Sequence, residues 1–463
     1  MKYNLHTFGC KVNTYDTGLI QKNLSQNGYT LGKNANENGG IHVLNTCAVT
    51  AEATKEAVRV IRRIKAKDPL AMIVVTGCAA QVDTQIFSEL PSVDLVVANS
   101  HKGLLPFILE QYFKGDRKEK VFKSNIFRKE DLEAGGGIEE KHSRAFLKIQ
   151  DGCNSFCTYC IIPYARGKSR SIGVGDLVRR VSELYDLGYR EVVLTGVHVG
   201  DYEVIENGQT YHLEDLLKAL LVKTQIQRFR LTSLEPGELS EELIEIYQDP
   251  RICPHFHMSI QSAEDSVLKG MKRNYVQSEV ISSLKKIDVK IKNAFVGMDV
   301  IVGFPGETKE LFQETYRVLA ETPWTKLHVF PFSERQGTRA AVMIDSVPMT
   351  ERKYRAAQLR DISHHRMQAE ALKQIGTAKK LIVLKETKKN EQGLWFGLSR
   401  DFWNVAIKSN IRADEAKTTE VEFQKLIDFP SQELTVEIQG IDLGTAASGD
   451  TILVGKPVSG VMA

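Results

Sequence analysis

Short apolar runs alternate with stretches of helical periodicity along the first 114 residues. Helical spacing of apolar residues occurs in Thr14–Leu24, Ala51–Ile64 and Lys102–Phe113, which predicts three helices. Four apolar runs are short enough for buried parallel strands: Tyr3–Phe8, Ile41–Leu44, Ala71–Val75 and Leu95–Ala98. The alternation predicts an α/β fold that starts with a small doubly wound parallel sheet.

The same alternation resumes at Arg144 and continues to about residue 330. Helical stretches such as Val174–Leu187 and Glu307–Ala320 separate the strand-like runs. The six runs are Ala145–Ile149, Glu191–Leu194, Phe229–Leu231, Phe256–Ile260, Phe295–Val302 and Lys326–Phe330. Six such units predict a parallel (βα) barrel or part of one. A long polar helix, about Thr350–Gln374, is expected after it.

Beyond Gly376 the pattern changes to short β-branched and aromatic runs, which predict a small all-β barrel. These runs are Leu381–Leu384, Leu394–Leu398, Phe402–Ile407, Thr419–Phe423, Leu434–Ile438 and Thr451–Val454. Residues 115–140 are dense in charge and contain three consecutive glycines at 135–137, which is typical of a linker. We therefore expect domains at 1–114, 141–375 and 376–463, joined by a linker at 115–140.

Composition excludes several classes of protein. With 463 residues, 42% hydrophobic and 26% charged, the chain is neither disordered, collagen-like nor a small disulfide scaffold. The 61 Lys+Arg against 58 Asp+Glu leave a net charge of +3, so the total charge does not argue for nucleic acid. No signal-peptide pattern opens the chain and no apolar run reaches about 18 residues, so we expect a cytoplasmic protein without membrane association.

The strongest chemical motif is CxxxCxxC at Cys153, Cys157 and Cys160, directly after a predicted strand. Three thiolates suit a four-iron cluster, which normally takes four Cys and is left here with one iron free for substrate or cofactor. Zinc is the alternative. Structural zinc wants four ligands, and no second CxxC or HxxxH near this motif completes the set.

Three isolated cysteines, Cys10, Cys47 and Cys78, each follow a predicted strand of the N-terminal sheet. Any one of them taken singly reads as a small buried hydrophobe. Because ligands of open α/β sheets bind beyond the carboxyl ends of the strands, three cysteines at equivalent ends predict a shared site.

Several segments together resemble the radical S-adenosylmethionine (SAM) methylthiotransferase family. The resemblance covers residues 9–340, and the β-rich tail is similar to that family's TRAM domain. Within the family, FGCKVNTYDT and PFSERQGT look most like the MtaB-type tRNA enzymes. The segments are GCKVN at 9–13, the isolated Cys47 and Cys78, DGCNSFCTYCIIPYARGKSRS at 151–171, LTSLEP at 231–236, DVIVGFPGET at 299–308 and HVFPFSERQGTRA at 328–340.

The resemblance implies two 4Fe–4S clusters and SAM as cofactors. Cys153, Cys157 and Cys160 would hold the cluster that binds SAM, whose reduction yields methionine and a 5'-deoxyadenosyl radical. Cys10, Cys47 and Cys78 would hold an auxiliary cluster that carries the sulfur, which a second SAM methylates. The implied enzyme adds a methylthio group to C2 of N6-threonylcarbamoyladenosine in tRNA, with an external electron donor and a sulfur source as further partners.

Other residues are weaker candidates for contact with SAM. Each of them lies at a predicted strand end or beside the cysteines, and each also has an ordinary structural interpretation as a turn, a loop or a packed residue. The six are Tyr159, Thr195, Gly196, Ser233, Glu235 and Gly303. Asn13 and Asn45 are expected to hydrogen-bond around the auxiliary cluster or to cap a helix. His198 and His328 are weak candidates, and Cys253 is expected to be structural.

For RNA, local charge matters more than the total. Residues 141–170 hold six basic residues and Asp151 as the single acidic one, so a phosphate could be drawn to this loop. A second dense run, Lys55–Lys67, has a solvated helix face as its alternative. The aromatic residues of the tail are expected mostly in its core, so tRNA binding there rests on the resemblance.

Two alternative functions stay open at this point. The first keeps the chemistry and changes the substrate to isopentenyladenosine in tRNA or to a ribosomal-protein aspartate. The second is a non-enzymatic iron–sulfur electron carrier or RNA-binding scaffold. A carrier would gain nothing from open irons and a full barrel.

Overall fold

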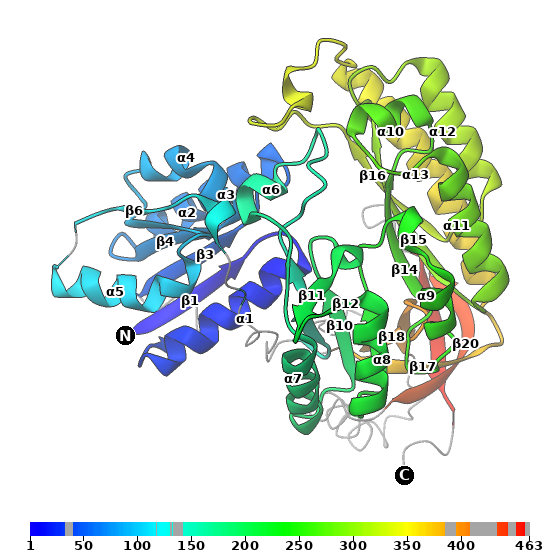
Figure 1. Cartoon of the computed structure of the whole chain (residues 1–463), viewed down its shortest axis with the longest axis horizontal. Coiled ribbons are helices and arrows are strands. Elements are labelled where there is room, and N and C mark those ends of the chain that lie inside the picture. Colours follow the sequence, from blue (N-terminus) through cyan, green and yellow to red (C-terminus); the bar gives the residue numbers. More distant parts are fainter. Residues whose placement is uncertain are drawn as a thin grey trace.

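The computed structural model describes residues 1–32, 40–116, 118–129, 132, 142–384, 395–407, 433–442 and 451–458. Figure 1 shows an N-terminal sheet with its helices on the left, a larger half-open barrel on the right and a small β-barrel beneath it. In the part of the chain described here, no helix combines the length and apolar character that crossing a membrane requires. The predicted strand Thr419–Phe423 and the glycines at 135–137 lie outside the described residues.

The N-terminal unit is a six-stranded, fully parallel sheet in the order β2-β1-β3-β4-β5-β6. Its strands are β1 (Lys2–Thr7), β2 (Thr30–Leu31), β3 (Ile41–Thr46), β4 (Met72–Gly77), β5 (Leu95–Ala98) and β6 (Val121–Phe122). The helices are α1 (Lys11–Gln26), α2 (Ala51–Lys67), α3 (Cys78–Val82), α4 (Thr84–Ser88) and α5 (Leu105–Lys114). The predicted doubly wound sheet is therefore confirmed. Strand β6 comes from the segment predicted as a linker, so the sheet extends beyond residue 114.

Local sequence explains where these helices begin and end. The Thr50 side chain accepts a hydrogen bond from the Ala53 N–H and caps α2. Helix α5 ends at Gly115 in the left-handed conformation that glycine adopts without strain. Strands β3, β4 and β5 are buried almost throughout, as expected for a parallel sheet with helices on both faces.

Six parallel strands form the central half-open barrel. They fall into two sheets, β7-β10-β13 and β14-β15-β16, and isolated bridges at Phe229–Ile252 and Leu234–Met258 join the sheets. The strands are β7 (Ala145–Lys148), β10 (Glu191–Thr195), β13 (Arg228–Leu231), β14 (His255–Gln261), β15 (Phe295–Val302) and β16 (Lys326–Pro331). The six predicted strands are confirmed in their predicted order.

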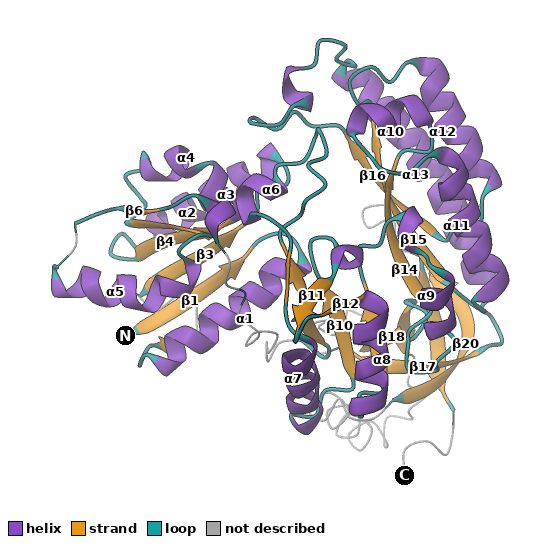
Figure 2. Ribbon diagram, in the orientation of Figure 1, coloured by secondary structure: helices purple, strands orange, loops and turns teal. Residues whose placement is uncertain are grey.

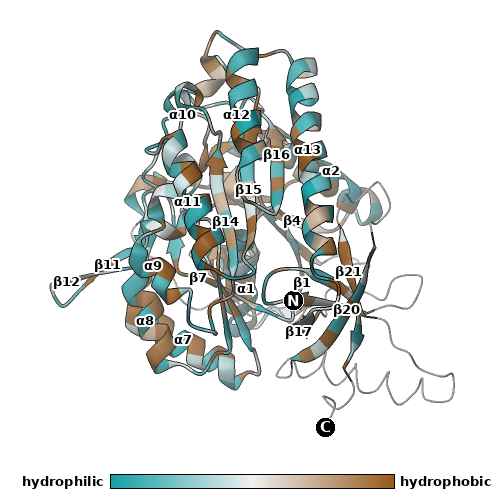
Figure 3. Ribbon diagram, turned by 90° about the vertical axis from the view of Figure 1, so that its right-hand side faces the viewer, coloured by the Kyte–Doolittle hydropathy of each residue, from teal (hydrophilic) through white to brown (hydrophobic). Residues whose placement is uncertain are grey.

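Helices cover the outside of this barrel, as Figure 2 shows in purple around the orange strands. They are α7 (Val174–Asp186), α8 (Leu213–Lys223), α9 (Glu241–Ile246), α10 (Asp265–Met271), α11 (Gln277–Lys290), α12 (Lys309–Glu321) and α13 (Met349–Leu372). Figure 3 shows α12 and α13 largely hydrophilic with interspersed hydrophobic residues, the pattern of helices packed on one face. Short elements that the sequence did not predict are β8 (Gln150–Asp151), α6 (Ile162–Arg166), β9 (Arg170–Ser171) and the hairpin β11 (Glu203–Glu206) and β12 (Gln209–His212).

The C-terminal unit is a closed five-stranded barrel in the order β17-β18-β19-β21-β20. Its strands are β17 (Ala378–Val383), β18 (Trp395–Ser399), β19 (Asn404–Ile407), β20 (Leu434–Asp442) and β21 (Ile452–Pro457). Trp403, Val405 and Val436 lie in its core, so the prediction of a small all-β barrel is confirmed. Arg228 and Arg230 of β13 are fully buried and donate to backbone carbonyls of this barrel, including those of Leu398 and Arg400.

Candidate functional site

The CxxxCxxC motif lies in the loop between β8 and α6, beyond the carboxyl end of β7. Backbone N–H groups of Ser155 and Ile162 donate to the sulfurs of Cys153 and Cys160, each at 3.4 Å. Burial, and then the charges of Cys157 and Cys153, raise the pKa of Cys160 to about 12. Cys157 is buried, and Cys153 and Cys160 are half-buried. Neighbouring thiols in such a place become thiolates when a metal supplies positive charge, so this donor set fits a metal cluster.

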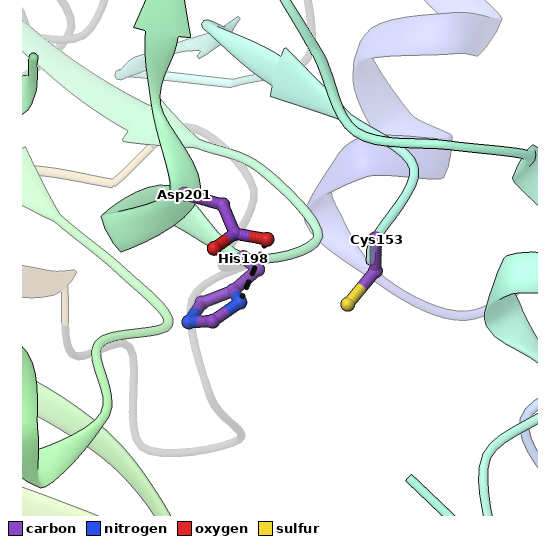
Figure 4. A group of neighbouring side chains, drawn as sticks. All are labelled: Cys153, His198 and Asp201. Atoms are coloured by element: carbon purple, nitrogen blue, oxygen red, sulfur yellow. Dashed lines mark ion pairs between the residues drawn. The ribbon is translucent and has the colours of Figure 1, made fainter. Parts of the chain in front are cut away.

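His198, in the loop after β10, faces Cys153 from across the mouth of the barrel (Figure 4). Its Nδ1 lies 3.2 Å from an Asp201 carboxylate oxygen, and its Nε2 pairs with Glu238. Burial alone would lower the pKa of His198, but hydrogen bonds with Asp201, Cys153 and Glu238 raise it far above the ordinary value. Burial would raise the pKa of the Cys153 thiol, but hydrogen bonding with His198 and Ser155 lowers it.

Cys10, Cys47 and Cys78 meet beyond the carboxyl ends of three neighbouring strands, β1, β3 and β4. Burial, and then the charges of Cys78 and Cys10, raise the pKa of Cys47 to about 11. Cys47 and Cys78 are buried whereas Cys10 is exposed, so the group is open on one side. The structure thus brings together three thiols that lie far apart in the sequence, and a donor set of three thiols fits a second metal cluster.

Three residues fix the spacing of these three loops. Gly9 has a φ of +89°, and a Cβ there would lie 2.6 Å from the Cys47 sulfur, so glycine allows the first two loops to touch. The Asn13 amide donates to the carbonyl of Phe8 at 2.8 Å and to that of Thr46 at 3.0 Å. Asn45 donates to the Asn13 carbonyl at 2.9 Å.

The two groups of cysteines belong to parts of the chain that pack directly on each other. Helix α3, which starts at Cys78, packs on α6, which starts just after Cys160. Asn99 donates to the Ala165 carbonyl of α6 at 2.9 Å and to the Cys78 sulfur at 3.6 Å. One side chain therefore contacts both a cysteine of the N-terminal sheet and the helix that follows the CxxxCxxC motif.

A buried ionic network, which we call the junction network, connects the same two parts. Its members are Asp16, Lys102, Lys148, Asp151 and Arg166. Arg166 reaches Asp16 at 3.0 Å and Asp151 at 2.8 Å, and Lys148 bridges the same two carboxylates. Lys102 pairs with Asp16 at 2.9 Å. Burial would raise the pKa of Asp16, but the charges of Lys102, Lys148 and Arg166 hold it well below the usual range.

Of the predicted SAM contacts, Tyr159 is part of the CxxxCxxC motif and Glu235 lies close to it. Glu235 pairs with Arg273 at 2.8 Å, and the same guanidinium donates to the Cys157 sulfur at 3.2 Å. Tyr159 is half-buried and packs against an apolar cluster that contains Met271 and Phe304.

Thr195, Gly196 and Ser233 lie at or just after the carboxyl ends of β10 and β13. A Cβ on Gly196 would lie 2.9 Å from the Gln150 side-chain oxygen, and Ser233 has a φ of +59°. Gly303 serves packing: a Cβ at this position would lie 2.3 Å from the Arg352 Cγ. These placements agree with both interpretations that the sequence left open.

The remaining weak candidates, His198, His328 and Cys253, lie in different parts of the structure. His198 contacts the cysteine loop, whereas His328 lies midway along β16, inside the barrel. Cys253 is fully buried ahead of β14, and its N–H donates to the Phe229 carbonyl at 2.8 Å.

The expected phosphate-binding patch near the cysteine loop is largely wrong. Lys148 and Arg166 are buried in the junction network, and Arg144 approaches Glu191 at 3.6 Å. Arg170 donates to the carbonyls of Lys129 and Arg166. Lys168 is exposed, and Lys141 lies outside the described residues.

Arg273 was not predicted, although it contacts both Cys157 and Glu235. It lies after α10, with 115 residues between it and Cys157, in the sequence MKRN, which has no feature of a binding motif. The single signal for Arg273 in the sequence was a basic residue in a loop of the predicted barrel. The partners of Asp16 escaped prediction for the same reason, because they come from distant segments.

Comparisons with known families and proteins agree with this architecture. The family described as "Uncharacterized protein family UPF0004" matches residues 2–98, and the "Radical SAM superfamily" matches residues 147–319. A relative from Aquifex aeolicus, "Threonylcarbamoyladenosine tRNA methylthiotransferase MtaB", is 36% identical over 84% of this chain and 94% of its own length.

A relative with another named substrate is also similar. The "tRNA-2-methylthio-N(6)-dimethylallyladenosine synthase" of Endomicrobium trichonymphae is 32% identical over 77% of this chain and 82% of its own. Among solved structures, the radical SAM methyltransferase TsrM from Kitasatospora setae has a TM-score of 0.55 at 11% identity, covering 74% of this chain and 77% of its own. That likeness concerns the fold alone.

Proposed function

We propose, from the premise that this chain belongs to the radical SAM methylthiotransferase family, that its substrate is N6-threonylcarbamoyladenosine in tRNA and that it adds a methylthio group to C2. Enzymes of this family bind 4Fe–4S clusters and SAM and modify tRNA. The observation that carries the proposal is the meeting of two groups of three cysteines across one packed junction, together with 36% identity to a relative named for that nucleoside.

We assign one cluster to each group of cysteines. Cys153, Cys157 and Cys160 would hold the cluster that binds SAM, and Cys10, Cys47 and Cys78 would hold the auxiliary cluster. Three thiolate ligands leave one iron of a four-iron cluster without a protein ligand. When bound, the clusters and SAM supply the electron, the sulfur and the methyl group of the reaction.

The chain's own residues position these cofactors. Arg273 donates to the Cys157 sulfur and offers a cation to the carboxylate of SAM, and Glu235 and Asp201 offer anions to its ammonium group. Thr195, Gly196 and Ser233, at the carboxyl ends of β10 and β13, would border the bound SAM, as would Tyr159 and Gly303. The junction network and Asn99 hold the N-terminal sheet against the CxxxCxxC loop, so that a nucleoside reaching both groups of cysteines is shielded from water.

We further propose the division of labour that the sequence predicted. Residues 1–114 with β6 would carry the auxiliary cluster, 141–375 the radical chemistry, and the TRAM-like barrel within 376–463 a tRNA contact. The electron donor and the sulfur source are external partners, and a tRNA substrate places the reaction in the cytoplasm.

The test is an anaerobic assay of the reconstituted enzyme with SAM, a reductant and three substrates. These are tRNA bearing threonylcarbamoyladenosine, tRNA bearing dimethylallyladenosine, and the ribosomal protein modified by related enzymes. Mass spectrometry of the products should show a methylthio group on the first tRNA alone. Modification of dimethylallyladenosine instead, the substrate named for a relative at 32% identity, would assign the chain to that reaction.

A further inference from the structure

Three strands of the barrel present charged and polar side chains on the face that looks into its interior. His255 and His257 alternate on β14, Gly297 and Asp299 on β15, and Lys326 and His328 on β16, so each pair shares one face of its strand. Figure 2 shows the three strands side by side with helices on their outer face. The intervening residues Phe256, Met298 and Leu327 are fully or almost fully buried on the opposite face of the strands.

The strand register brings these polar residues together. His257 is paired with Gly297 and Gly297 with Lys326, while Asp299 is paired with His328. The His257 Nε2 lies 3.0 Å from an Asp299 carboxylate oxygen, and the His257 and His328 rings meet edge to face at 5.8 Å. The interior of a barrel needs no charges for stability, so this polar layer points to a ligand.

A pocket of about 390 Å³ lies over this layer, and all three parts of the chain line it. Lys11 begins α1 of the N-terminal unit, Phe402 and Asn404 come from the closed β-barrel, and β14, β15, β16 and α13 supply the rest. Phe402 stacks on His255 with ring centroids 3.9 Å apart, which closes one end. The volume is within the range of a nucleoside-sized site.

Positive charge exceeds negative charge around the pocket. Two lysines, Lys11 and Lys326, and one carboxylate, Asp299, line the pocket, and Asp299 shares a hydrogen bond with His257. Lys11 also lies within electrostatic range of Arg144 and Arg230, two cations that share Glu191. An anionic group is therefore stabilised there.

Lys11 directly follows Cys10, so a ligand in this pocket lies next to the proposed auxiliary cluster. In adenosine, C2 and N6 belong to the same edge of the base. When C2 is held at that cluster, the substituent on N6 extends beside it. A threonylcarbamoyl group ends in a carboxylate, whereas a dimethylallyl group is apolar.

We propose that this pocket binds the N6 substituent of the substrate and that Lys326, with Lys11, recognises its carboxylate. The inference rests on the proposed function and adds the residues that distinguish an anionic substituent from an apolar one. His257, Asp299 and His328 hydrogen-bond the carbamoyl and hydroxyl groups of the same substituent.

The test compares two anticodon stem–loops bound to the reconstituted holoenzyme. One carries threonylcarbamoyladenosine and the other carries its methyl ester, which differs in the loss of the negative charge. Affinities are measured by fluorescence anisotropy. The wild-type enzyme should bind the acid about tenfold or more tightly than the ester, as expected for a charge-assisted hydrogen bond.

Lys326→Met should reduce this preference to about twofold or less, and Lys326→Arg should keep most of it. The control is Lys223→Met, an exposed lysine at the end of α8, which should bind as wild type does. Iron content and thermal unfolding show whether each variant is folded and loaded.

Three results would overturn the inference. The wild type could modify the acid yet bind acid and ester equally, which leaves the proposed function intact. Lys326→Met could keep the full preference. His257, Asp299 and His328 could together bind one equivalent of Zn²⁺. Loss of this zinc in His328→Ala, with the RNA affinity unchanged, would make the layer a metal site. A wild-type enzyme that modifies dimethylallyladenosine instead would contradict the proposed function itself.

Discussion

The two groups of three cysteines reach similar arrangements by opposite routes. Cys153, Cys157 and Cys160 lie within eight consecutive residues of one loop, so their proximity is local. Cys10, Cys47 and Cys78 come from three loops, and their proximity depends on the parallel order of β1, β3 and β4. The proximity of the first group follows from the sequence alone, whereas the proximity of the second depends on the folded sheet. The second should therefore be more sensitive to changes in packing.

Removing one cysteine from each group should separate two activities. Cys157→Ala should abolish reductive SAM cleavage and with it methylthiolation, because the cluster that binds SAM is lost. Cys47→Ala should keep SAM cleavage and lose methylthiolation. Liquid chromatography of 5'-deoxyadenosine and of the nucleosides measures both products, and iron content should fall by about half in each variant.

Cys253→Ala is the matched control, since Cys253 is buried and lies outside both groups. It should keep both clusters and both activities. Loss of one cluster in this variant, or loss of SAM cleavage in Cys47→Ala, would contradict the division between the groups.

The junction network should have the next largest effect. Asp16→Asn leaves Lys102, Lys148 and Arg166 with less negative charge in a buried place, which should cost about 3–5 kcal/mol of unfolding free energy. Denaturant unfolding measures the loss. Asp176→Asn, which removes an exposed ion pair with Arg179, is the control and should change stability by less than about 1 kcal/mol.

The junction network also predicts how the free energy of unfolding changes with pH. Because neighbouring cations hold the pKa of Asp16 below its usual range, its contribution is complete above the unfolded pKa of about 4. It is lost as the pH falls through the lower folded value. The stability difference between wild type and Asp16→Asn should therefore be constant from pH 8 to 5 and shrink below about pH 4. A difference that grows on acidification would refute this.

Arg273 contacts the group of cysteines that lie close together in the sequence, through the Cys157 sulfur. Arg273→Met removes the donor to the Cys157 sulfur and the partner of Glu235, so SAM cleavage should fall about 10- to 100-fold. The reduction potential of the cluster should become more negative, since a positive charge near it is lost. Arg179→Met, on an exposed helix face, should change neither quantity.

The smallest effect is expected from two glycines with similar backbone conformation. Gly9→Ala and Gly28→Ala both introduce a side chain at positive φ, which costs about 1 kcal/mol. At Gly9 the new Cβ also meets the Cys47 sulfur at 2.6 Å, whereas at Gly28 no atom lies within 4 Å. Iron content of the auxiliary cluster should therefore drop in Gly9→Ala alone. Equal iron loading of the two variants would show that the packing around Cys47 tolerates the change.

Sequence reasoning succeeded where periodicity and short-range spacing carry the information. The buried parallel strands of the first two units read as continuous apolar runs, so the N-terminal sheet and the six barrel strands were predicted from the sequence. It failed where partners are distant. Lys148 and Arg166 were interpreted as cations for a phosphate, yet Asp16 and Asp151 neutralise them in the interior. Arg273 lacked any motif because its role follows from a loop that folds back over Cys157.

Arg228 and Arg230 have a consequence for how far the chain can be divided. Both guanidinium groups are solvent-free and complete their hydrogen bonds with carbonyls of the C-terminal barrel. A truncation that ends before β17 would remove these carbonyls and leave the two guanidinium groups with Glu191 as their shared buried partner. The described strands of the C-terminal barrel, β17–β21, therefore keep water from these two arginines, and a protein shortened to residues 1–375 would expose them.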